Sequence, residues 1–371
     1  MKFLHLSDLH LGKRLRGFSL LEDQRYFLFE QTLPLLKEEG IDVLVIAGDI
    51  YDVPAPSQDS VVLLDDFITA CANLRIRVLM IPGNHDSSLR LSYGSKIFRD
   101  RGIYIVTDIK NSVHPIEIDG VNFYLLPFMK HHDVNGAFEQ EFKDYNSAAA
   151  FMVEQMQLDN SKINVLVAHQ LVLPHHGDLE FGGSEEVVVG TVGNIDSSVF
   201  SQFDYVALGH IHKSQAVGDN AHYCGSPLRY HVDEARQEKS FYIVDVQKGR
   251  VEITHKPIHV LHELRVLDGN YADVIAMPPS EDYVFVNLLD NAYVENAIDA
   301  IRQTAFPHCL GLAYPNIGST ESGEETVPEF DSEHPEELFP KFYEMVLGQR
   351  LTNFQSETVL ELLEKAKEGR Q

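Results

Sequence analysis

Five short motifs within the first 212 residues carry side chains that bind divalent cations in proteins. They contain Asp8 and His10 in SDLH, Asp49 and Asp52 in AGDIYD, Asn84, His85 and Asp86 in PGNHD, His169 in VAHQ, and His210 and His212 in LGHIH. Carboxylate, amide and imidazole groups together favour manganese, iron or zinc, because magnesium and calcium prefer shells made of oxygen alone. The combination predicts a site that holds two such cations side by side.

Each motif taken alone also fits a simpler role. Asp49 after a strand would also cap the following helix, and Asn84 would also form a turn. A lone His169 is more often a core histidine with satisfied hydrogen bonds. The occurrence of all five motifs, each directly after an apolar run, is what favours the metal site.

Short apolar runs must position these motifs. Strands are expected over Phe3–Leu6, Val43–Ala47, Val78–Pro82, Ile103–Val106, Val121–Leu126, Ile163–Ala168 and Tyr205–Leu208. Helices are expected near 20–39, 58–74, 90–101 and 136–158. This alternation predicts a layered α/β domain, in which ligands bind beyond the carboxyl ends of the strands. Residues two apart in an extended segment point the same way, so the D-x-H and H-x-H motifs each predict a two-pronged clamp.

The chain is expected to divide into four segments. Residues 1–258 form the α/β domain. Residues 259–316 predict a small α/β module, which contains a strand at Tyr283–Leu288. Residues 317–337 include eight Asp and Glu but no Lys or Arg, which is typical of a solvated linker. Residues 338–371 predict two C-terminal helices.

The composition is typical of a soluble globular protein, but the formal net charge is −26. This charge opposes binding to nucleic acid, because phosphates are normally bound by Lys and Arg. The first 110 residues, however, hold 13 basic against 15 acidic residues, and bound cations would offset some of these carboxylates. No apolar run reaches the ~18–20 residues of a membrane span, and the first residues lack the pattern of a signal peptide. We therefore expect a cytoplasmic protein with no membrane partner.

At the five motifs the chain resembles the calcineurin-like metallophosphoesterases, whose pattern is D-x-H, G-D-x-x-D, G-N-H-D, a separate H, and G-H-x-H. The longer segments SDLHLG, AGDIYD, FDYVALGHIHKSQ and YCGSPLRYHVDEA resemble the SbcD family, the nuclease subunits of bacterial SbcCD DNA-repair complexes. The likeness is dense over residues 1–245, although His231-Val232 stands where that family usually has Ser-Phe. The resemblance implies a β-sandwich flanked by helices, with a small capping domain and C-terminal helices. It also implies a nuclease that degrades double-stranded DNA from 3′ to 5′ and cuts single strands and hairpins.

The resemblance assigns a role to each motif residue. The implied ligands are Asp8, His10 and His212 for one cation, Asn84, His169 and His210 for the other, and Asp49 for both. Manganese is the usual cation of the family. His85 would face the scissile phosphate and stabilise or protonate the leaving oxygen, while Asp52 and Asp86 would orient histidine side chains. Two cations would activate a water nucleophile and neutralise the phosphate during an in-line displacement.

Basic residues near the motifs, and the C-terminal helices, provide the expected contacts with partners. The candidates for contacts with DNA phosphates are Lys13, Arg14, Arg16 and Arg90. Their positions are equally consistent with ordinary solvated loops that bind no DNA. The resemblance implies that residues 338–371 bind the coiled coil of an SbcC-like ATPase, which would supply much of the DNA-binding surface. It also implies a homodimer within a heterotetramer. The helices could otherwise pack on their own domain.

Two other functions compete with this interpretation. The chain could be a metallophosphoesterase that acts on phosphoproteins, cyclic nucleotides or small phosphate esters, or a scaffold that kept the fold and lost the chemistry. The SbcD-like segments outside the motifs argue against the first, and the intact ligand set with His85 argues against the second.

Overall fold

The computed structural model describes residues 1–175, 179–180, 193–317, 355–356 and 359. The chain divides into a compact unit, Met1–Ile317, and a second unit, Gly318–Gln371. Nearly all of the expected acidic linker and C-terminal helices therefore lie outside the described residues. Within the described part of the chain, no helix is long and apolar enough to cross a membrane.

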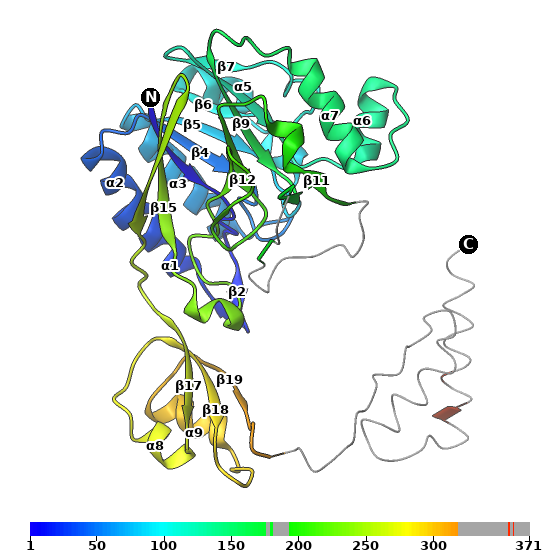
Figure 1. Cartoon of the computed structure of the whole chain (residues 1–371). Helices are drawn as coiled ribbons and strands as arrows, with labels where there is room; N and C mark the ends of the chain where they lie inside the picture. The colour runs from blue at the N-terminus through cyan, green and yellow to red at the C-terminus, as the bar shows by residue number, and fades with distance from the viewer. Residues whose placement is uncertain (176–178, 181–192, 318–354, 357–358, 360–371) are drawn as a thin grey trace. The chain divides into compact units, whose positions relative to one another are not determined.

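The first of two six-stranded sheets contains the N-terminal strand (Figure 1). Its strands are, in order across the sheet, β16 (Arg250–Pro257), β15 (Ser240–Gln247), β1 (Lys2–Leu6), β4 (Val43–Ala47), β5 (Arg77–Ile81) and β6 (Ile103–Ile105). The run from β1 to β6 is parallel, whereas β15 and β16 are antiparallel to their neighbours. Strand β4 is buried along its whole length, which explains its unbroken run of Val, Leu, Ile and Ala.

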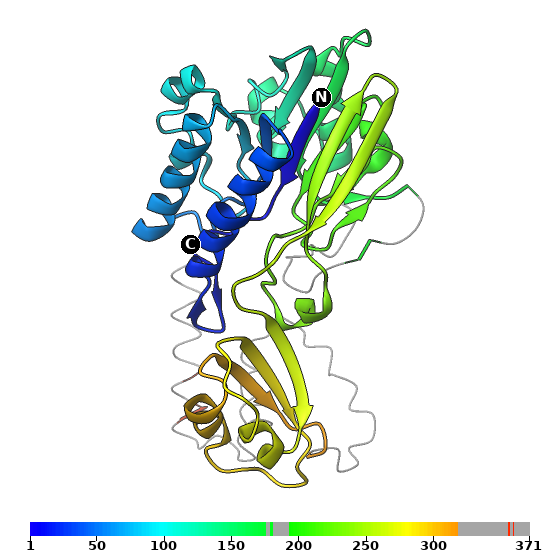
Figure 2. The ribbon, with the colours of Figure 1, turned by 90° about the vertical axis from the view of Figure 1, so that its left-hand side faces the viewer.

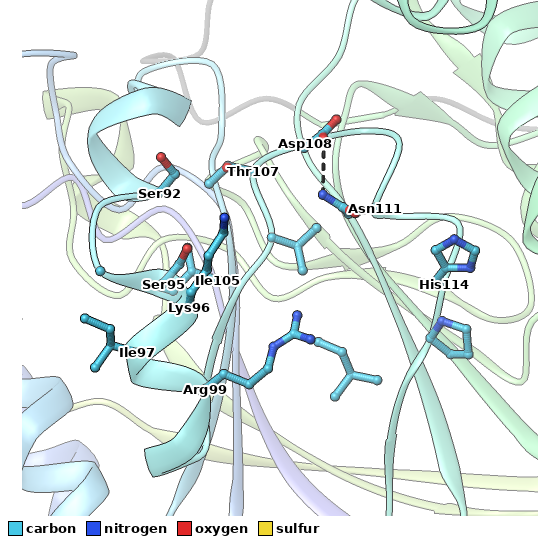
Figure 3. Close-up of a pocket in the computed structure, with 14 residues that line it drawn as sticks. Ser92, Ser95, Lys96, Ile97, Arg99, Ile105, Thr107, Asp108, Asn111 and His114 are labelled. Atoms are coloured by element: carbon cyan, nitrogen blue, oxygen red, sulfur yellow. Dashed lines mark hydrogen bonds between the residues drawn. The ribbon is translucent and has the colours of Figure 1, made fainter.

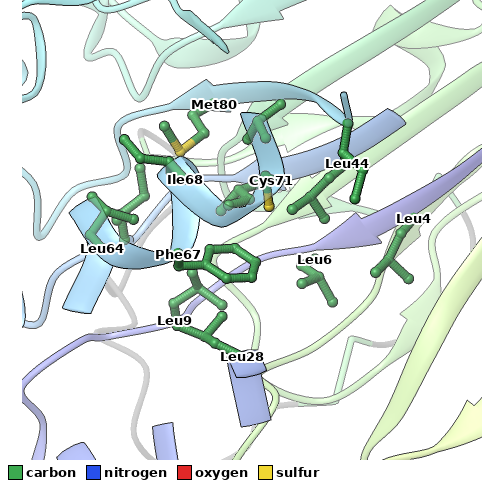
Figure 4. Close-up of a cluster of buried hydrophobic side chains, with 14 of the residues drawn as sticks. Leu4, Leu6, Leu9, Leu28, Leu44, Leu64, Phe67, Ile68, Cys71 and Met80 are labelled. Atoms are coloured by element: carbon green, nitrogen blue, oxygen red, sulfur yellow. The ribbon is translucent and has the colours of Figure 1, made fainter. Parts of the chain in front are cut away.

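Helices cover one face of this sheet (Figure 2). They are α1 (Leu21–Tyr26), a π-helical turn (Phe27–Thr32), α2 (Leu33–Glu38) and α3 (Gln58–Asn73). Figure 4 shows how α3 packs: Phe67 and Cys71, one turn apart, point toward the leucines of β1 and β4. Ser57 caps α3 by accepting a hydrogen bond from the backbone N–H of Ser60.

The second sheet has the order β13 (Gln215–Ala216), β14 (Ala221–Tyr223), β12 (Tyr205–Gly209), β9 (Ile163–His169), β8 (Val121–Leu126) and β7 (Ile116–Ile118). Helices α6 (His131–Phe138) and α7 (Tyr145–Met156) supply side chains to the core on its outer face. Between the two sheets lies a third core, to which Phe3, Val45, Phe123, Val167 and Tyr205 contribute. The result is two sheets packed face to face and flanked by helices, which confirms the expected fold class.

A smaller sheet of β17 (Leu264–Gly269), β18 (Tyr283–Leu288) and β19 (Cys309–Ala313) forms a small α/β module within residues 259–316, the segment expected to be a capping module. Helices α8 (Tyr271–Ile275) and α9 (Ala297–Thr304) complete its separate core. The module contacts the larger domain through the buried Asp23, whose carboxylate accepts hydrogen bonds from the Tyr283 hydroxyl (3.0 Å) and the His262 backbone N–H (3.1 Å).

Two predicted helices are wrong in their extent. The expected helix near 136–158 is two helices, because Glu139 adopts a left-handed conformation with φ 56°. The side-chain amide of Asn135 donates a hydrogen bond to the Phe142 carbonyl and accepts one from the Phe142 backbone N–H. The expected helix at 90–101 is broken at Gly94, with φ 75°, into α4 (Ser88–Leu91) and α5 (Ser95–Phe98).

Two histidines, the buried His5 of β1 and the half-buried His222 of β14, predict sensitivity to acid. Burial and the charge of His222 lower the pKa of His5 to about 3, and burial and His255 lower the pKa of His222 to about 4. Each histidine stays neutral in the folded state but binds a proton in the unfolded state below pH ~6.5. Stability is therefore present above pH ~6.5 and falls as the pH drops toward 4, by up to about 1.4 kcal/mol per pH unit for each histidine.

We expect His222→Gln to reduce this slope. The free energy of unfolding of metal-free protein should be measured by urea denaturation between pH 4.5 and 7.5, with the exposed His132→Gln as the matched control. Equal slopes for the His222 variant and the wild type would contradict the prediction.

Candidate metal centre

Each of the five motifs lies at the end of a strand, and these strand ends meet in one region of the β-sandwich. Asp8 and His10 follow β1, Asp49 follows β4, and the segment from Asn84 to Asp86 follows β5 of the first sheet, whereas His169 ends β9 and His210 follows β12 of the second. Four of these residues, Asp8, His10, Asp49 and His210, have positive φ angles between 43° and 106°. Non-glycine residues rarely adopt this conformation, which costs of order 1–3 kcal/mol each and is concentrated at functional sites.

Asp8, His10 and His212 form the first cluster. One ligand atom from each residue lies within 4.8 Å of the others, and all three side chains are buried. The Nε2 atoms of His10 and His212 are 3.2 Å apart. The hydroxyl of Ser7 donates a hydrogen bond to the Asp8 carboxylate. The structure thus brings together the three residues that were expected to share one cation.

Asn84, His169 and His210 form the second cluster. The Oδ1 atom of Asn84 lies 3.1 Å from Nε2 of His169 and 3.0 Å from Nδ1 of His210. The other ring nitrogen of His169 donates to the Ala47 carbonyl at 2.8 Å, which fixes the orientation of its ring. These three residues are the set expected for the second cation.

Asp49 lies between the two clusters. Its Oδ2 atom is 3.5 Å from Nε2 of His10 in the first cluster and 3.3 Å from Nε2 of His169 in the second. Close packing holds it there, because a Cβ atom added to Gly83 would lie 2.1 Å from Oδ1 of Asp49. This is the position expected for a bridging carboxylate.

His85 lies at the edge of this group, half-buried, with its ring 4.8 Å from that of His10. Its Nδ1–H donates to the backbone carbonyl of Asp52 at 2.9 Å. The Asp52 carboxylate instead faces His10, at 3.4 Å from Nδ1. Asp86 accepts hydrogen bonds from the backbone N–H groups of Ile50, Tyr51 and Gly83, so its carboxylate holds the loops that carry Asp49 and Asn84.

Charge coupling within the centre shifts the pKa values of neighbouring groups in opposite directions. Burial raises the pKa of Asp49, but the charge and hydrogen bond of His169 outweigh it and hold the pKa below its ordinary value. Burial lowers the pKa of His169, and the Asp49 carboxylate reverses this and raises the pKa to about 9. Burial and the charge of His169 lower the pKa of His210 to about 3. Such unlike shifts among adjacent groups are typical of functional sites.

The residues fit two divalent cations by charge as well as by donor type. Asp8 and Asp49 are 0% and 2% exposed, and burial together with the charge of Asp49 raises the pKa of Asp8. Two neighbouring carboxylates are costly to bury unless positive charge compensates them. Bound cations would supply that charge, and the mixed oxygen and nitrogen donors suit manganese, iron or zinc.

Sequence reasoning missed several residues that support the first cluster. Glu234 lies 3.3 Å from Nδ1 of His212, and the ring of Tyr230 packs edge-on against both His10 and His212. Gln24 accepts a hydrogen bond from the Gly12 N–H and donates to the His10 carbonyl. Glu234 and Tyr230 lie within YCGSPLRYHVDEA, but their burial beside His212 has no signal in the sequence.

All four basic residues proposed to contact DNA phosphates make contacts within the protein. Lys13 pairs with Asp52 at 2.9 Å, and Arg90 donates to the Pro54 carbonyl at 2.7 Å. Arg16 lies over the ring of Phe285 in the capping module, 5.1 Å from its centroid. The guanidinium of Arg14 donates to the Gly17 carbonyl. These contacts favour a structural role for Arg16 in particular.

A separate cavity of about 840 Å³ lies near the edge strand β6 (Figure 3). Lys96 and Arg99 line it on one side, and Asn111 and His114 line it on the other. It contains none of the seven residues expected to bind cations, so it is not part of the candidate centre.

Comparison with known proteins identifies the family. Residues 1–214 match the family model described as calcineurin-like phosphoesterase. The chain belongs to this family. It is therefore a metal-dependent phosphoesterase, as the five motifs predicted.

Relatives extend the likeness over almost the whole chain. A protein of Staphylococcus epidermidis and one of Staphylococcus saprophyticus, both named as the SbcD component of the nuclease SbcCD, are each 33% identical to this chain, with 98% of both chains covered. This confirms the resemblance to the SbcD family. A solved structure from Thermus thermophilus, TT1561, covers 68% of this chain and 98% of its own at 12% identity, with a TM-score of 0.40, which is too distant to bear on the site.

Proposed function

We propose that this chain is the nuclease subunit of an SbcCD-type complex and hydrolyses phosphodiester bonds of DNA with two divalent cations. Manganese is the cation that we propose for both positions. The observation that carries the proposal is the position of Asp49, 3.5 Å from His10 of one cluster and 3.3 Å from His169 of the other. The nuclease names of relatives that cover 98% of the chain support the choice of substrate. We propose 3′ to 5′ degradation of double strands and cleavage of single strands and hairpins as its activities.

His85 and Asp86 have separate roles in the proposed reaction. Two bound cations would activate a water nucleophile and neutralise charge on the phosphate. The Nδ1–H of His85 donates to the Asp52 carbonyl, so that Nε2, when the ring carries a second proton, would donate that proton to the leaving oxygen. Asp86 fixes the loops after β4 and β5 through three backbone hydrogen bonds, so that Asp49 and His85 keep their positions without rearrangement during the reaction.

The direct test is to incubate the purified protein with manganese and blunt double-stranded DNA, with and without the ATPase partner. A phosphoprotein, a cyclic nucleotide and a phosphomonoester serve as competing substrates. The proposal expects metal-dependent release of nucleotides from DNA in preference to the other three substrates. Cleavage of a competing substrate alone would reject the nuclease.

An exposed apolar surface supports a homodimer. It is defined by the exposed residues Val61 and Val62 of α3, Leu89 of α4, and Tyr93, which line a cavity of about 810 Å³. Leu89 and Tyr93 are 83% and 86% exposed. Contiguous apolar patches of this kind mark protein contacts on soluble proteins. We propose that a second copy of this chain covers the surface.

The homodimer predicts that Tyr93→Glu yields monomers, because burial of an unpaired carboxylate in an apolar interface costs several kcal/mol. The molar mass should be measured by light scattering after size-exclusion chromatography. Tyr293→Glu is the matched control, since Tyr293 is also largely exposed (73%) but lies in the capping module. A dimer that persists in Tyr93→Glu, or a wild-type monomer, would exclude this surface.

The proposed partner is a coiled-coil ATPase of the SbcC type that binds residues 338–371. Deletion of residues 334–371 is expected to abolish co-purification with the ATPase. The folded unit Met1–Ile317 contains every residue of the centre, so cleavage of a small phosphodiester such as bis(p-nitrophenyl) phosphate should change less than twofold. Assembly of the complex with the truncated chain would contradict the assignment.

A further inference from the structure

A buried ion pair lies behind the His212 ring, on the side away from the first cluster. Glu234 and Lys239 are 0% and 7% exposed, and the Lys239 ammonium lies 2.8 Å from Oε2 of Glu234. Both belong to the segment Ser226–Lys239, which forms a short 3₁₀ turn at Val232–Arg236. Charged residues are rarely buried so fully unless they are paired. The pair therefore needs an explanation in terms of what it contacts.

The two nitrogens of His212 face different partners. Nε2 lies 3.2 Å from Nε2 of His10 and belongs to the cluster with Asp8. Nδ1 lies 3.3 Å from Oε1 of Glu234. A carboxylate accepts a hydrogen bond, so this contact places the ring hydrogen on Nδ1 and leaves a lone pair on Nε2, where a cation would bind.

Lys239 holds Glu234 in this position. Its three N–H groups lie among four oxygens within hydrogen-bond distance: Oε2 of Glu234, the Ser226 hydroxyl at 2.9 Å, the Gln237 side-chain carbonyl at 3.0 Å, and the backbone carbonyl of His212 at 3.0 Å. Lys239 therefore links the Glu234 carboxylate to the backbone of His212. Because both carboxylate oxygens have a partner, Glu234 has little freedom to turn away from Nδ1 of His212.

His10, the other histidine of the first cluster, has a related arrangement. Its Nδ1 lies 3.4 Å from the Asp52 carboxylate. His169 of the second cluster is held instead by the neutral Ala47 carbonyl. A carboxylate partner raises the basicity of an imidazole ligand more than a neutral carbonyl does, and loss of such a partner typically weakens metal affinity about 10–100-fold.

We propose that Glu234 is a positioning residue that fixes His212 for the first cation and strengthens it as a ligand, with Lys239 as its anchor. The inference rests on the proposed two-metal centre. Replacement of Glu234 should therefore weaken binding of the first cation and leave binding of the second unchanged.

The test is manganese binding, measured by isothermal titration calorimetry on the full-length protein. The wild type is expected to bind two ions per chain. Glu234→Ala should weaken one of the two sites about 10–100-fold and leave the other within threefold. Glu234→Gln keeps an oxygen that can accept from Nδ1 and should lose less than tenfold. Asp233→Asn, the adjacent and exposed carboxylate of the same turn, is the matched control and should bind like the wild type.

A double-mutant cycle separates positioning from a general structural role. In a His212→Gln background, Glu234→Ala should cause no further loss of affinity, because the ring that it orients is gone. Equal weakening of both sites, or an additive loss in the His212 background, would overturn the proposal. If Glu234→Ala does not fold, judged by the circular dichroism melting curve of metal-free protein, Glu234→Gln carries the same comparison. A wild type that binds fewer than two ions would refute the two-metal centre itself, whereas unchanged binding by Glu234→Ala would refute only this inference.

Discussion

Replacement of His85 by alanine should reduce DNA cleavage about 10²–10⁴-fold while two manganese ions remain bound. The reason lies in the geometry of its ring, which is half-buried, reachable by a substrate, and held by the Asp52 carbonyl. The loss should appear in the rate constant for cleavage at saturating DNA, because His85 acts on the leaving group in the transition state. Single-turnover cleavage and metal content by mass spectrometry are the two measurements.

The metal content decides between two roles for this histidine. His10, Asp52 and His85 form a further cluster whose ligand atoms lie within 4.8 Å of one another, so a ligand role is geometrically open to His85. If metal content in His85→Ala fell in proportion to cleavage, His85 would be a ligand. The exposed His132→Ala is the matched control and should retain full activity.

Replacement of Asp49 by alanine should remove one of the two cations and lower cleavage at least about 10²–10³-fold, the scale of losing one major electrostatic contact with the transition state. Asp49 contacts both clusters through Oδ2, while its Oδ1 accepts the backbone N–H of His85 at 2.9 Å. The variant therefore loses the shared ligand and also the contact that places His85. Manganese titration followed by electron paramagnetic resonance distinguishes a paired centre from a single ion.

Asp49→Asn separates these two effects. The amide oxygen can still accept the His85 N–H, but the charge shared between the cations is lost. We expect it to lose the paired-ion signal as Asp49→Ala does. A normal paired signal in both variants would show that Asp49 does not bridge.

The sequence predicted those features that depend on local apolar pattern and on strand ends. The strands Val43–Ala47, Val121–Leu126 and Tyr283–Leu288 have the predicted bounds, because each is a short, mostly buried apolar run. The convergence of the five motifs was predictable because their strands lie in two packed sheets whose relevant ends lead to one region.

Other features of the fold and of the metal centre could not be predicted from the neighbouring residues in the sequence. The break at Glu139 depends on the Asn135 side chain, which binds the backbone seven residues later, and residues 139–144 (EQEFKD) contain no Gly or Pro that would mark it. Glu234 looks like an ordinary acidic surface residue in the sequence, and only the fold buries it against His212. Contacts of Arg16 with the capping module likewise depend on the packing of segments far apart in the chain.

Anomalous diffraction from crystals grown with manganese tests the two-metal centre most directly. We expect two peaks about 3.5–4 Å apart, one beside Asp8, His10 and His212 and the other beside Asn84, His169 and His210, with Asp49 in contact with both. A single peak, or two peaks of which only one contacts Asp49, would contradict the assignment.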